Sequence, residues 1–268
     1  MSIFAQLMNL LFYKYEGAGN DFIVFDNRRK EIALDATQIQ RLCDRHFGIG
    51  ADGVLLLEES AAYDFEMVYY NADGSSASFC GNGGRCMVAF AAYLGIIKEK
   101  AVFVAGDGVH AAQIISTLDN YTKLIAMQMT DAVVYECNAD FYYLNTGTYH
   151  VVKFVDDLEN YEVFEEGRKM RYDKRFEPHG TNVNFVKYNN GNLQVRTYEK
   201  GVEDETLACG TGVTASAIAA GIKYGGNVFS VKAKGGDLNV SFDVNDDKYV
   251  NITLTGEAKQ VFKGNTTI

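Results

Sequence analysis

The sequence predicts an α/β (α+β) protein with two pseudo-symmetric domains, each a curved mixed β-sheet wrapped around a central helix. Two stretches, CMVAFAAYLG at 86–95 and VTASAIAAGI at 213–222, have almost no charged face, and a helix that is apolar all round is buried on every side. Each follows a Cys-Gly-x-Gly motif, and β-rich segments lie on either side of both. This repeat indicates duplication, and we expect the two helix starts to face one cleft that holds the active site.

In the first half the expected elements are extended chain over 10–27 broken at 16–21, a helix over 35–46, strands over 53–58 and 64–71, and the central helix from Gly84 to about Gly95. The helix over 35–46 is indicated by Asp35 or Thr37 as its cap, and by Ile39, Leu42 and Cys43 on one face.

Short strands are expected over most of 100–155. In the second half the expected elements are a hairpin over 181–201 that turns at Asn190-Gly191, a helix from Gly210 that stops at Gly225, and closing strands over 230–244 and 249–258. The division into domains is expected at 1–129 and 130–255.

Composition and charge exclude several classes of protein. The formal net charge is −10 and no basic stripe stands out, which argues against a nucleic-acid partner. No apolar run is long enough to span a bilayer. The apolar opening segment has no basic residue before Lys14, as a secretory signal would require, so we expect a first strand with a short extension before Met8, and a cytoplasmic protein.

The five cysteines are an odd and sparse set, which is not a disulfide framework, and no CxxC spacing predicts a zinc site. Cys43, Cys86 and Cys137 are expected to be inert, buried side chains. Cys80 and Cys209 differ because each precedes Gly-x-Gly and a buried helix.

A cysteine at the start of a helix is suited to ionise and to transfer a proton. The unpaired N–H groups of a helix's first turn bind anions, so a carboxylate can be held beside the thiol. Helix-terminus interactions reach about 2 kcal/mol and one pKa unit is about 1.4 kcal/mol, so a thiol's pKa falls from about 8.5 to about 7. One thiolate and one thiol can then exchange protons on opposite faces of a carbon next to a carboxylate. No motif for a pyridoxal phosphate lysine or a metal stands out, so we expect no cofactor and no metal.

A phosphate-binding glycine loop is the competing interpretation of Gly-x-Gly. A P-loop requires GxxxxGK[ST], which the sequence lacks, and a Rossmann fingerprint requires a spacing that CGNGGRC does not supply.

Five segments closely resemble the diaminopimelate epimerase family, in family order along nearly the whole chain. They are GAGNDFIVFDNR (17–28), RHFGIGADGVLLLE (45–58), NADGSSASFCGNGGRC (71–86), GTNVNFV (180–186) and VRTYEKGVEDETLACGTG (195–212). The resemblance implies cofactor-independent conversion of LL- to meso-diaminopimelate, in lysine and peptidoglycan precursor biosynthesis. It also implies that a final strand over 256–268 joins the first half.

The resemblance implies roles for individual residues. Cys80 and Cys209 match the acid/base pair, His150 a histidine beside them, and Glu199 an acidic residue near the substrate amine. The residues matched to substrate binding are the helix-start pairs Gly81, Asn82, Gly210 and Thr211, and the side chains Asn20, Asn71 and Asn184.

Three positions depart from the family. Lys200 stands where an arginine usually grips the distal carboxylate, and a lysine offers a point charge instead of a planar fork. Thr148 and Tyr149 replace an Asn-Pro pair before His150, and Gly53 stands where some members carry a glutamine. Gly53, Thr148 and Lys200 are still candidates for substrate contact, and all three changes concern substrate fit.

Plain structural roles stay open for several of these residues. Asn20 and Asn71 can be turn residues, Asn184 a buried structural amide, His150 an ordinary core histidine and Glu199 a solvated carboxylate.

Other functions stay open as well. A related racemase or isomerase, proline-racemase-like or PhzF-like, would act on another substrate, although the PhzF type lacks the cysteine pair. A non-catalytic amino-acid-binding protein would need no paired thiols, and a thiol-disulfide oxidoreductase usually shows CxxC. The expected partner is a small amino acid, with no nucleic acid and no membrane, and a homodimer is left open.

Overall fold

A computed structural model describes residues 9–246 and 248–268, so the extension expected before Met8 lies outside the described residues. The chain divides into two compact units. Unit 1 takes in the chain up to Ile125 together with Ala258–Ile268, and unit 2 is Ala126–Glu257. None of the helices in the described part of the chain has the length and apolar character that crossing a bilayer requires.

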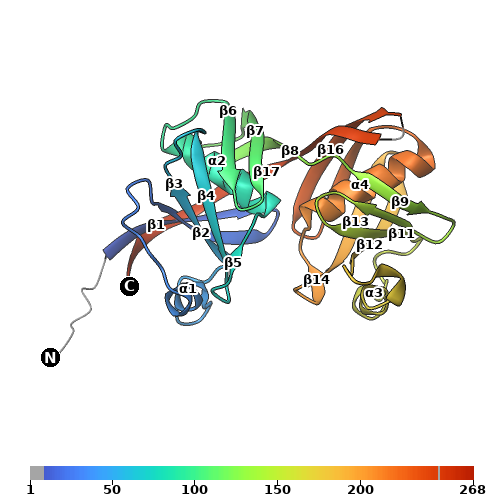
Figure 1. Cartoon of the computed structure of the whole chain (residues 1–268), viewed down its shortest axis with the longest axis horizontal. Coiled ribbons are helices and arrows are strands. Elements are labelled where there is room, and N and C mark those ends of the chain that lie inside the picture. The colour runs from blue at the N-terminus through green and yellow to red at the C-terminus, as the bar shows by residue number, and fades with distance from the viewer. Residues whose placement is uncertain (1–8, 247) are drawn as a thin grey trace. The chain divides into compact units, whose positions relative to one another are not determined.

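Unit 1 is a mixed sheet around one helix (Figure 1). Its elements are β1 (Asn9–Gly17), β2 (Asn20–Asp26), α1 (Ala36–Cys43), β3 (Gly53–Glu58), β4 (Phe65–Asn71), β5 (Ser76–Ala77), α2 (Gly81–Tyr93), β6 (Lys100–Ala105) and β7 (Gly108–Thr117). The strand order is β1-β2-β3-β4-β6-β7, in which β2–β3 and β4–β6 are parallel and the other neighbours antiparallel. The helix α2 contacts β1, β2, β3, β4 and β7, so the sheet curves around it.

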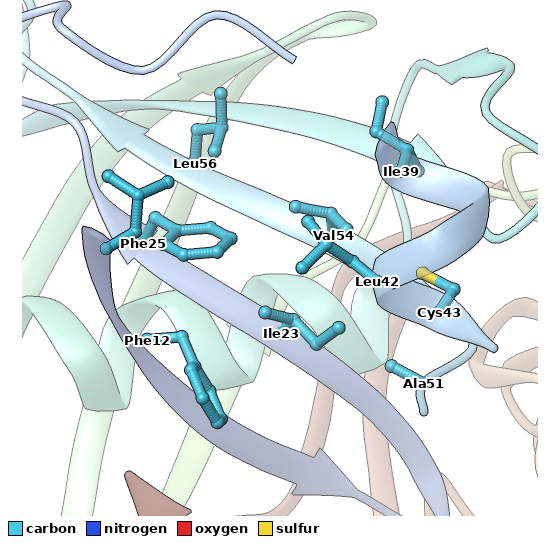
Figure 2. Packing of buried hydrophobic residues seen from close by; sticks show 10 residues of the cluster. Phe12, Ile23, Phe25, Ile39, Leu42, Cys43, Ala51, Val54 and Leu56 are labelled. Atoms are coloured by element: carbon cyan, nitrogen blue, oxygen red, sulfur yellow. The ribbon is translucent and has the colours of Figure 1, made fainter. Parts of the chain in front are cut away.

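The strands β2 and β3 are buried on both faces, which explains their continuous apolar sequence. Phe22 of β2 faces the start of α2. Its neighbours Ile23 and Phe25 point the other way and pack with Ile39 and Leu42 of α1 (Figure 2). Two layers of core therefore form, one on each side of the sheet.

Unit 2 repeats this architecture. Its elements are β9 (Val133–Cys137), β10 (Tyr142–Asn145), β11 (Tyr149–Phe154), α3 (Val163–Arg171), a 3-10 turn (Lys174–Phe176), β12 (Asn182–Asn189), β13 (Asn192–Glu199), β14 (Asp204–Thr206), α4 (Gly210–Tyr224), β15 (Val228–Ala233) and β16 (Gly236–Asn245). The order is β9-β10-β11-β12-β13-β15-β16, in which β11–β12 and β13–β15 are parallel. The helix α4 contacts β10–β13, β15 and β16, while α3 packs on β12 and β13.

Two strands, β17 and β8, belong partly to each unit. The strand β17 (Lys248–Thr267) pairs with β16 up to Gly256 and with β1 from Lys259 onward. The strand β8 (Thr122–Gln128) pairs with β17. The predicted fold class, two similar mixed-sheet halves around central helices, is confirmed by this strand order.

Several local predictions differ from the structure. The helix α2 begins at Gly81, before the expected Gly84, because the glycines of its first turn are compatible with helix despite their low propensity. The helix α1 ends at Cys43 instead of residue 46, and Asp35 rather than Thr37 caps it in a capping box with Gln38. Cys137 was expected to be buried but is exposed, because it ends β9, which pairs on one side with β10.

Candidate active site

Each central helix begins directly after a cysteine. Cys80 is the N-cap of α2 and Cys209 the N-cap of α4, both with extended backbone (φ −141°, ψ 123° and φ −109°, ψ 110°). Cys80 is half-buried and Cys209 is buried. The first-turn N–H groups that follow each thiol, from Gly81 and Gly210 onward, are suited to bind an anion.

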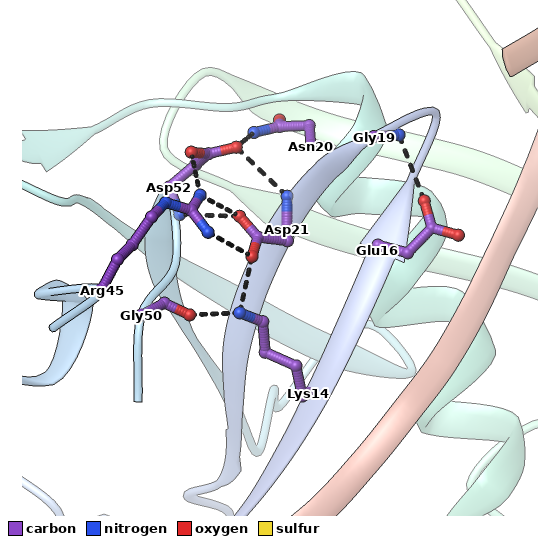
Figure 3. A network of polar contacts seen from close by, with 8 residues as sticks. All are labelled: Lys14, Glu16, Gly19, Asn20, Asp21, Arg45, Gly50 and Asp52. Atoms are coloured by element: carbon purple, nitrogen blue, oxygen red, sulfur yellow. Dashed lines mark hydrogen bonds and ion pairs between the residues drawn. The ribbon is translucent and has the colours of Figure 1, made fainter. Parts of the chain in front are cut away.

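In unit 1 the side chain of Asn20 links Cys80 to a network of charges. Asn20 begins β2, and its Oδ1 lies 3.4 Å from Cys80 Sγ. Its Nδ2 donates to Asp52 Oδ2 at 2.7 Å, and the same oxygen accepts from the Asp21 backbone N–H at 3.2 Å (Figure 3). Asp52, which sequence analysis did not single out, therefore holds the amide of Asn20 in place.

The network continues through Asp21 to two cations. Arg45 donates to both oxygens of Asp21, at 3.1 and 2.7 Å, and to Asp52 Oδ1 at 2.8 Å. Lys14 donates to Asp21 Oδ2 at 2.6 Å and to the Gly50 carbonyl (Figure 3). Burial acts to raise the pKa of Asp21, but the hydrogen bonds from Arg45 and Lys14 outweigh it and lower that pKa from 3.8 to about 2.

The other candidates of unit 1 have structural contacts. Asn71 Nδ2 donates to Ser75 Oγ at 3.1 Å, which places this amide in the turn that ends β4. Gly53 packs closely against β4, since a Cβ here would stand 2.6 Å from the Tyr70 carbonyl and 2.7 Å from the Tyr69 ring. A larger residue at 53 requires both the Tyr69 ring and the backbone of β4 to move.

Asn82, at the second position of α2, is buried and accepts from Arg85. Arg85 Nη2 donates to Asn82 Oδ1 at 2.7 Å, and its Nη1 lies 3.4 Å from the Gly81 carbonyl. The Arg85 side chain is fully buried, and its Nε has no hydrogen-bond partner among the described residues. The sequence does not single out this arginine, because the helix around it has almost no charged face.

In unit 2 the thiol is joined to a histidine by a threonine. Cys209 Sγ lies 3.4 Å from Thr211 Oγ1, and that oxygen lies 2.9 Å from His150 Nε2. Thr148 Oγ1 lies 3.0 Å from the same ring nitrogen. Three residues predicted from the sequence, His150, Thr148 and Thr211, are thus brought together with Cys209.

The other nitrogen of the histidine faces Asn184. Asn184 Nδ2 lies 3.1 Å from His150 Nδ1 and donates to the Val151 carbonyl at 3.1 Å, while its Oδ1 accepts from Thr197 Oγ1 at 2.9 Å. Both side chains are fully buried. Burial, with Lys200 acting in the same direction, lowers the pKa of His150 to about 3, so the ring is neutral at neutral pH.

Glu199 and Lys200 lie at the end of β13. Glu199 Oε2 accepts from Thr206 Oγ1 at 2.8 Å, and burial raises the pKa of Glu199 although this hydrogen bond opposes it. The ammonium of Lys200 donates to the His179 carbonyl at 2.9 Å. Asn182, a buried residue that sequence analysis missed, accepts from the Lys200 N–H at 2.9 Å and donates to Thr148 Oγ1 at 3.1 Å.

The two units differ at equivalent positions of their sheets. Phe22 pairs with Gly53 where His150 pairs with Asn182, and Leu55 pairs with Tyr69 where Asn184 pairs with Thr197. The polar cluster behind Cys209 therefore has an apolar counterpart in unit 1. Among the described residues, no group of three or more His, Cys, Asp or Glu side chains is placed to hold a metal ion.

Comparison with known proteins agrees with these features. The family model described as diaminopimelate epimerase matches residues 12–134 and 142–261. The diaminopimelate epimerase of Flavobacterium psychrophilum is 48% identical over 260 residues, covering 96% of this chain and 99% of its own length. That of Chlorobaculum tepidum is 40% identical over 264 residues, covering 94% and 99%.

The chain belongs to the diaminopimelate epimerase family.

This confirms the resemblance stated from five sequence segments. Solved structures at low identity share the fold of this diaminopimelate epimerase family member. A PhzF-family protein of Bacillus anthracis aligns with a TM-score of 0.75 at 16% identity, covering 97% of this chain and 100% of its own. A hydroxyproline epimerase from Agrobacterium vitis aligns with a TM-score of 0.72 at 13% identity, covering 97% and 93%.

Proposed function

We propose that this chain is a cofactor-independent epimerase that converts LL- to meso-diaminopimelate with one thiol from each unit. The observation that carries the proposal is that the repeat puts a cysteine at the N-cap of the central helix in both units. Family membership supports the substrate, and the place in lysine and peptidoglycan precursor biosynthesis follows from it.

The reaction is a proton transfer in two directions. A thiolate at one of Cys80 and Cys209 removes the α-proton from one face of the substrate, and the thiol of the other delivers its proton to the opposite face. The carbon is thereby inverted, and the two sulfurs exchange protonation states. The first-turn amides at Gly81-Asn82 and Gly210-Thr211 hold the substrate carboxylate and stabilise the negative charge that develops on it.

The remaining candidates are assigned to orientation and substrate fit. Asn20 lies against the Cys80 thiol and Asn184 against His150, and both stay predictions as substrate contacts. The half-buried Glu199 receives the substrate amine. Lys200 is exposed and offers its ammonium to the distal carboxylate as a point charge. Asn71, Gly53 and Thr148 stay predictions as substrate contacts.

Isotope exchange tests the reaction and the substrate together. The protein in heavy water should incorporate deuterium at the α-carbon of LL-diaminopimelate while meso product forms. Cys80→Ala and Cys209→Ala should each abolish epimerisation while circular dichroism stays unchanged. Unlabelled meso product would exclude the proposed proton transfer, and near-normal turnover of either variant would mean that the cysteine is misassigned. A screen of proline and other amino acids under the same conditions distinguishes a related racemase.

We also expect the protein in the cytoplasm, where thiols stay reduced. Assembly as a homodimer stays a prediction, which sedimentation at several concentrations tests.

A further inference from the structure

The two cysteines lie in hydrogen-bond networks whose polarity can be worked out from groups that only accept. In unit 1 that group is the carboxylate of Asp52. A carboxylate accepts and does not donate, so the atom of Asn20 that faces Asp52 at 2.7 Å is the amide nitrogen. The amide oxygen of Asn20 must then face Cys80, at 3.4 Å (Figure 3 shows the Asn20–Asp52 contact). An oxygen that accepts is satisfied by a thiol, which donates, and repels a thiolate.

In unit 2 the fixed point is the Val151 carbonyl. It accepts from Asn184 at 3.1 Å, so the amide nitrogen of Asn184 also faces His150 Nδ1 at 3.1 Å. The nitrogen Nδ1 of the neutral ring is then the acceptor, and the ring proton is on Nε2.

The ring proton sets the direction of the last contact. Because Nε2 carries the proton, it donates to the hydroxyl oxygens beside it, those of Thr211 at 2.9 Å and Thr148 at 3.0 Å. The hydroxyl proton of Thr211 therefore cannot go to His150, and it is available to Cys209 Sγ at 3.4 Å. A hydroxyl that donates stabilises a thiolate and disfavours a thiol.

We propose that, in the substrate-free chain, Cys80 carries the proton and Cys209 is the thiolate, and that Asp52 and Asn184 are positioning residues that establish this difference. The assignment deepens the proposed function and rests on it only for its catalytic meaning. The stereoisomer whose α-hydrogen faces Cys209 reacts from the resting state. Its α-proton moves to Cys209 while the proton of Cys80 moves to the product, so the chain must then redistribute a proton before it repeats the same reaction.

Charged and titratable groups near the two sulfurs also affect which of them holds the proton. In unit 1 these groups are Glu16 of β1, Asp21 of β2, and Arg85 and Cys86 of α2 itself. Tyr15 of β1 lies near Cys86, Tyr69 of β4 meets Phe22 edge to face, and His110 of β7 stacks on Phe79. In unit 2 the neutral ring of His150 from β11 lies beside Thr211, and Lys200 acts on the pKa of that ring. Glu199 precedes Lys200 at the end of β13. Arg85 acts against the proposal because a buried cation favours a thiolate at Cys80, whereas Glu16 acts with it.

Alkylation in the intact protein tests the assignment. Iodoacetamide reacts with thiolates, so the pH at which a cysteine's initial alkylation rate is half-maximal, its midpoint, is the pH at which half of that thiol is ionised. Peptide mass spectrometry measures the two cysteines separately. In the unmodified chain the midpoint of Cys209 should lie below that of Cys80 by about one pH unit. The exposed Cys137 serves as a check on the reagent. The reverse order would show that Arg85 dominates and would overturn the proposal, even if no variant folds.

Paired variants test the two networks. Thr211→Val should raise the Cys209 midpoint by about one pH unit and leave Cys80 unchanged. Its matched control, Thr148→Val, removes the other hydroxyl that contacts His150 Nε2 and should leave the Cys209 midpoint unchanged. Asp52→Asn frees the Asn20 amide to turn and should lower the Cys80 midpoint, by more than Glu16→Gln, which removes one charge without touching Asn20. Equal shifts within either pair would contradict the assignment.

These outcomes are separable from those of the proposed function. Midpoints in the expected order without deuterium incorporation would keep the assignment and reject the epimerase reaction. Deuterium incorporation with midpoints in the reverse order would support the epimerase reaction and reject the assignment.

Discussion

At the scale of single residues, a glycine in the first turn of α4 makes room for the polar cluster of unit 2. A Cβ on Gly212 would overlap Asn184 Oδ1, so only glycine allows the amide to reach both Thr197 and His150. The equivalent residue of unit 1 is Gly83, whose nearest neighbour for an added Cβ is the flexible end of Met67 at 3.2 Å. The repeat therefore offers the same substitution in a polar and an apolar setting.

We expect Gly212→Ala to lower kcat at least tenfold, which corresponds to about 1.4 kcal/mol in the barrier, because the methyl group displaces Asn184 from His150. Gly83→Ala should cost much less, since Met67 can move. Steady-state kinetics on both variants, with circular dichroism as a check on folding, measures this difference. Similar losses in the two variants would mean that neither helix start tolerates a methyl group, and that the contact with Asn184 is not the cause.

The sequence predicted part of this site for identifiable reasons. Cys80, Cys209 and the glycines after them stand at a strand-to-helix junction, which local sequence reveals. Asp52, Asn182 and Thr197 could not be found this way, since their partners Asn20, Thr148 and Asn184 are met only through strand pairing. The signal for Asp52 was its place in RHFGIGADG, which sequence analysis used only for the resemblance.

At the scale of elements, ion pairs connect the β1–β2 hairpin to the segment after α1. Lys14 comes from β1, Asp21 from β2 and Arg45 from the turn that follows α1. The side chains of Lys14 and Asp21 are only 7% and 17% exposed, so solvent weakens their attraction little. Because folding lowers the pKa of Asp21, the folded chain is more stable with Asp21 ionised than with Asp21 protonated.

Acid should remove this stabilisation. The folded-state pKa of Asp21 is lowered from 3.8 to about 2, so its contribution is complete above about pH 4 and is lost as the pH falls toward 2. A shift of this size corresponds to about 2 kcal/mol of unfolding free energy. Asp21→Asn should thus be less stable than the unmodified chain at pH 7, and the difference should shrink between pH 4 and pH 2. Denaturant unfolding followed by circular dichroism measures it.

The control for this experiment is Asp237→Asn, which changes an exposed carboxylate of β16. Its difference from the unmodified chain should be small and should not change with pH. A gap between Asp21→Asn and the unmodified chain that stays constant down to pH 2 would mean that the Asn side chain fits poorly, and that the ion pairs contribute little.

Elements were predictable where hydrophobic period and turn residues agreed. The hairpin at Asn190-Gly191 and the stop of α4 at Gly225 are where the sequence predicted them. The helix α3 was not predicted, since its buried residues are few, Val163 and Gly167, and its stability depends on packing against β12 and β13. Tertiary packing of this kind leaves little periodic signal.

At the scale of the whole molecule, the duplicated fold has kept its strand order and changed its interior. Both units place a cysteine before a central helix, yet Phe22 and Leu55 of unit 1 stand where unit 2 has His150 and Asn184. A sequence comparison of CGNGGRC with CGTGVTA predicts the repeat but not this difference, because the differing residues lie on strands far along the sequence from either motif. Two chemically distinct surroundings for two equivalent thiols are what a one-thiol, one-thiolate pair requires.

The C-terminal strand connects the folding of the two units in a way that truncation can test. From Lys259 onward β17 pairs with β1, and Phe262 meets Phe12 edge to face with ring centroids 5.9 Å apart. Deleting 258–268 removes this strand from unit 1 while the pairing of β16 with β17 up to Gly256 is kept. A central strand that becomes an edge loses its hydrogen-bond partners on one side.

We therefore expect the deletion to raise amide hydrogen exchange in β1 and β2 strongly, and to leave the peptides of α4 protected as before. Val261→Ser is the matched control, because Val261 is 51% exposed and the substitution keeps the backbone pairing with β1. Hydrogen exchange followed by mass spectrometry resolves the two units in one experiment. Loss of protection in α4 as large as that in β1 would mean that the units unfold together, and that β17 is more than a strand shared between two separately packed cores.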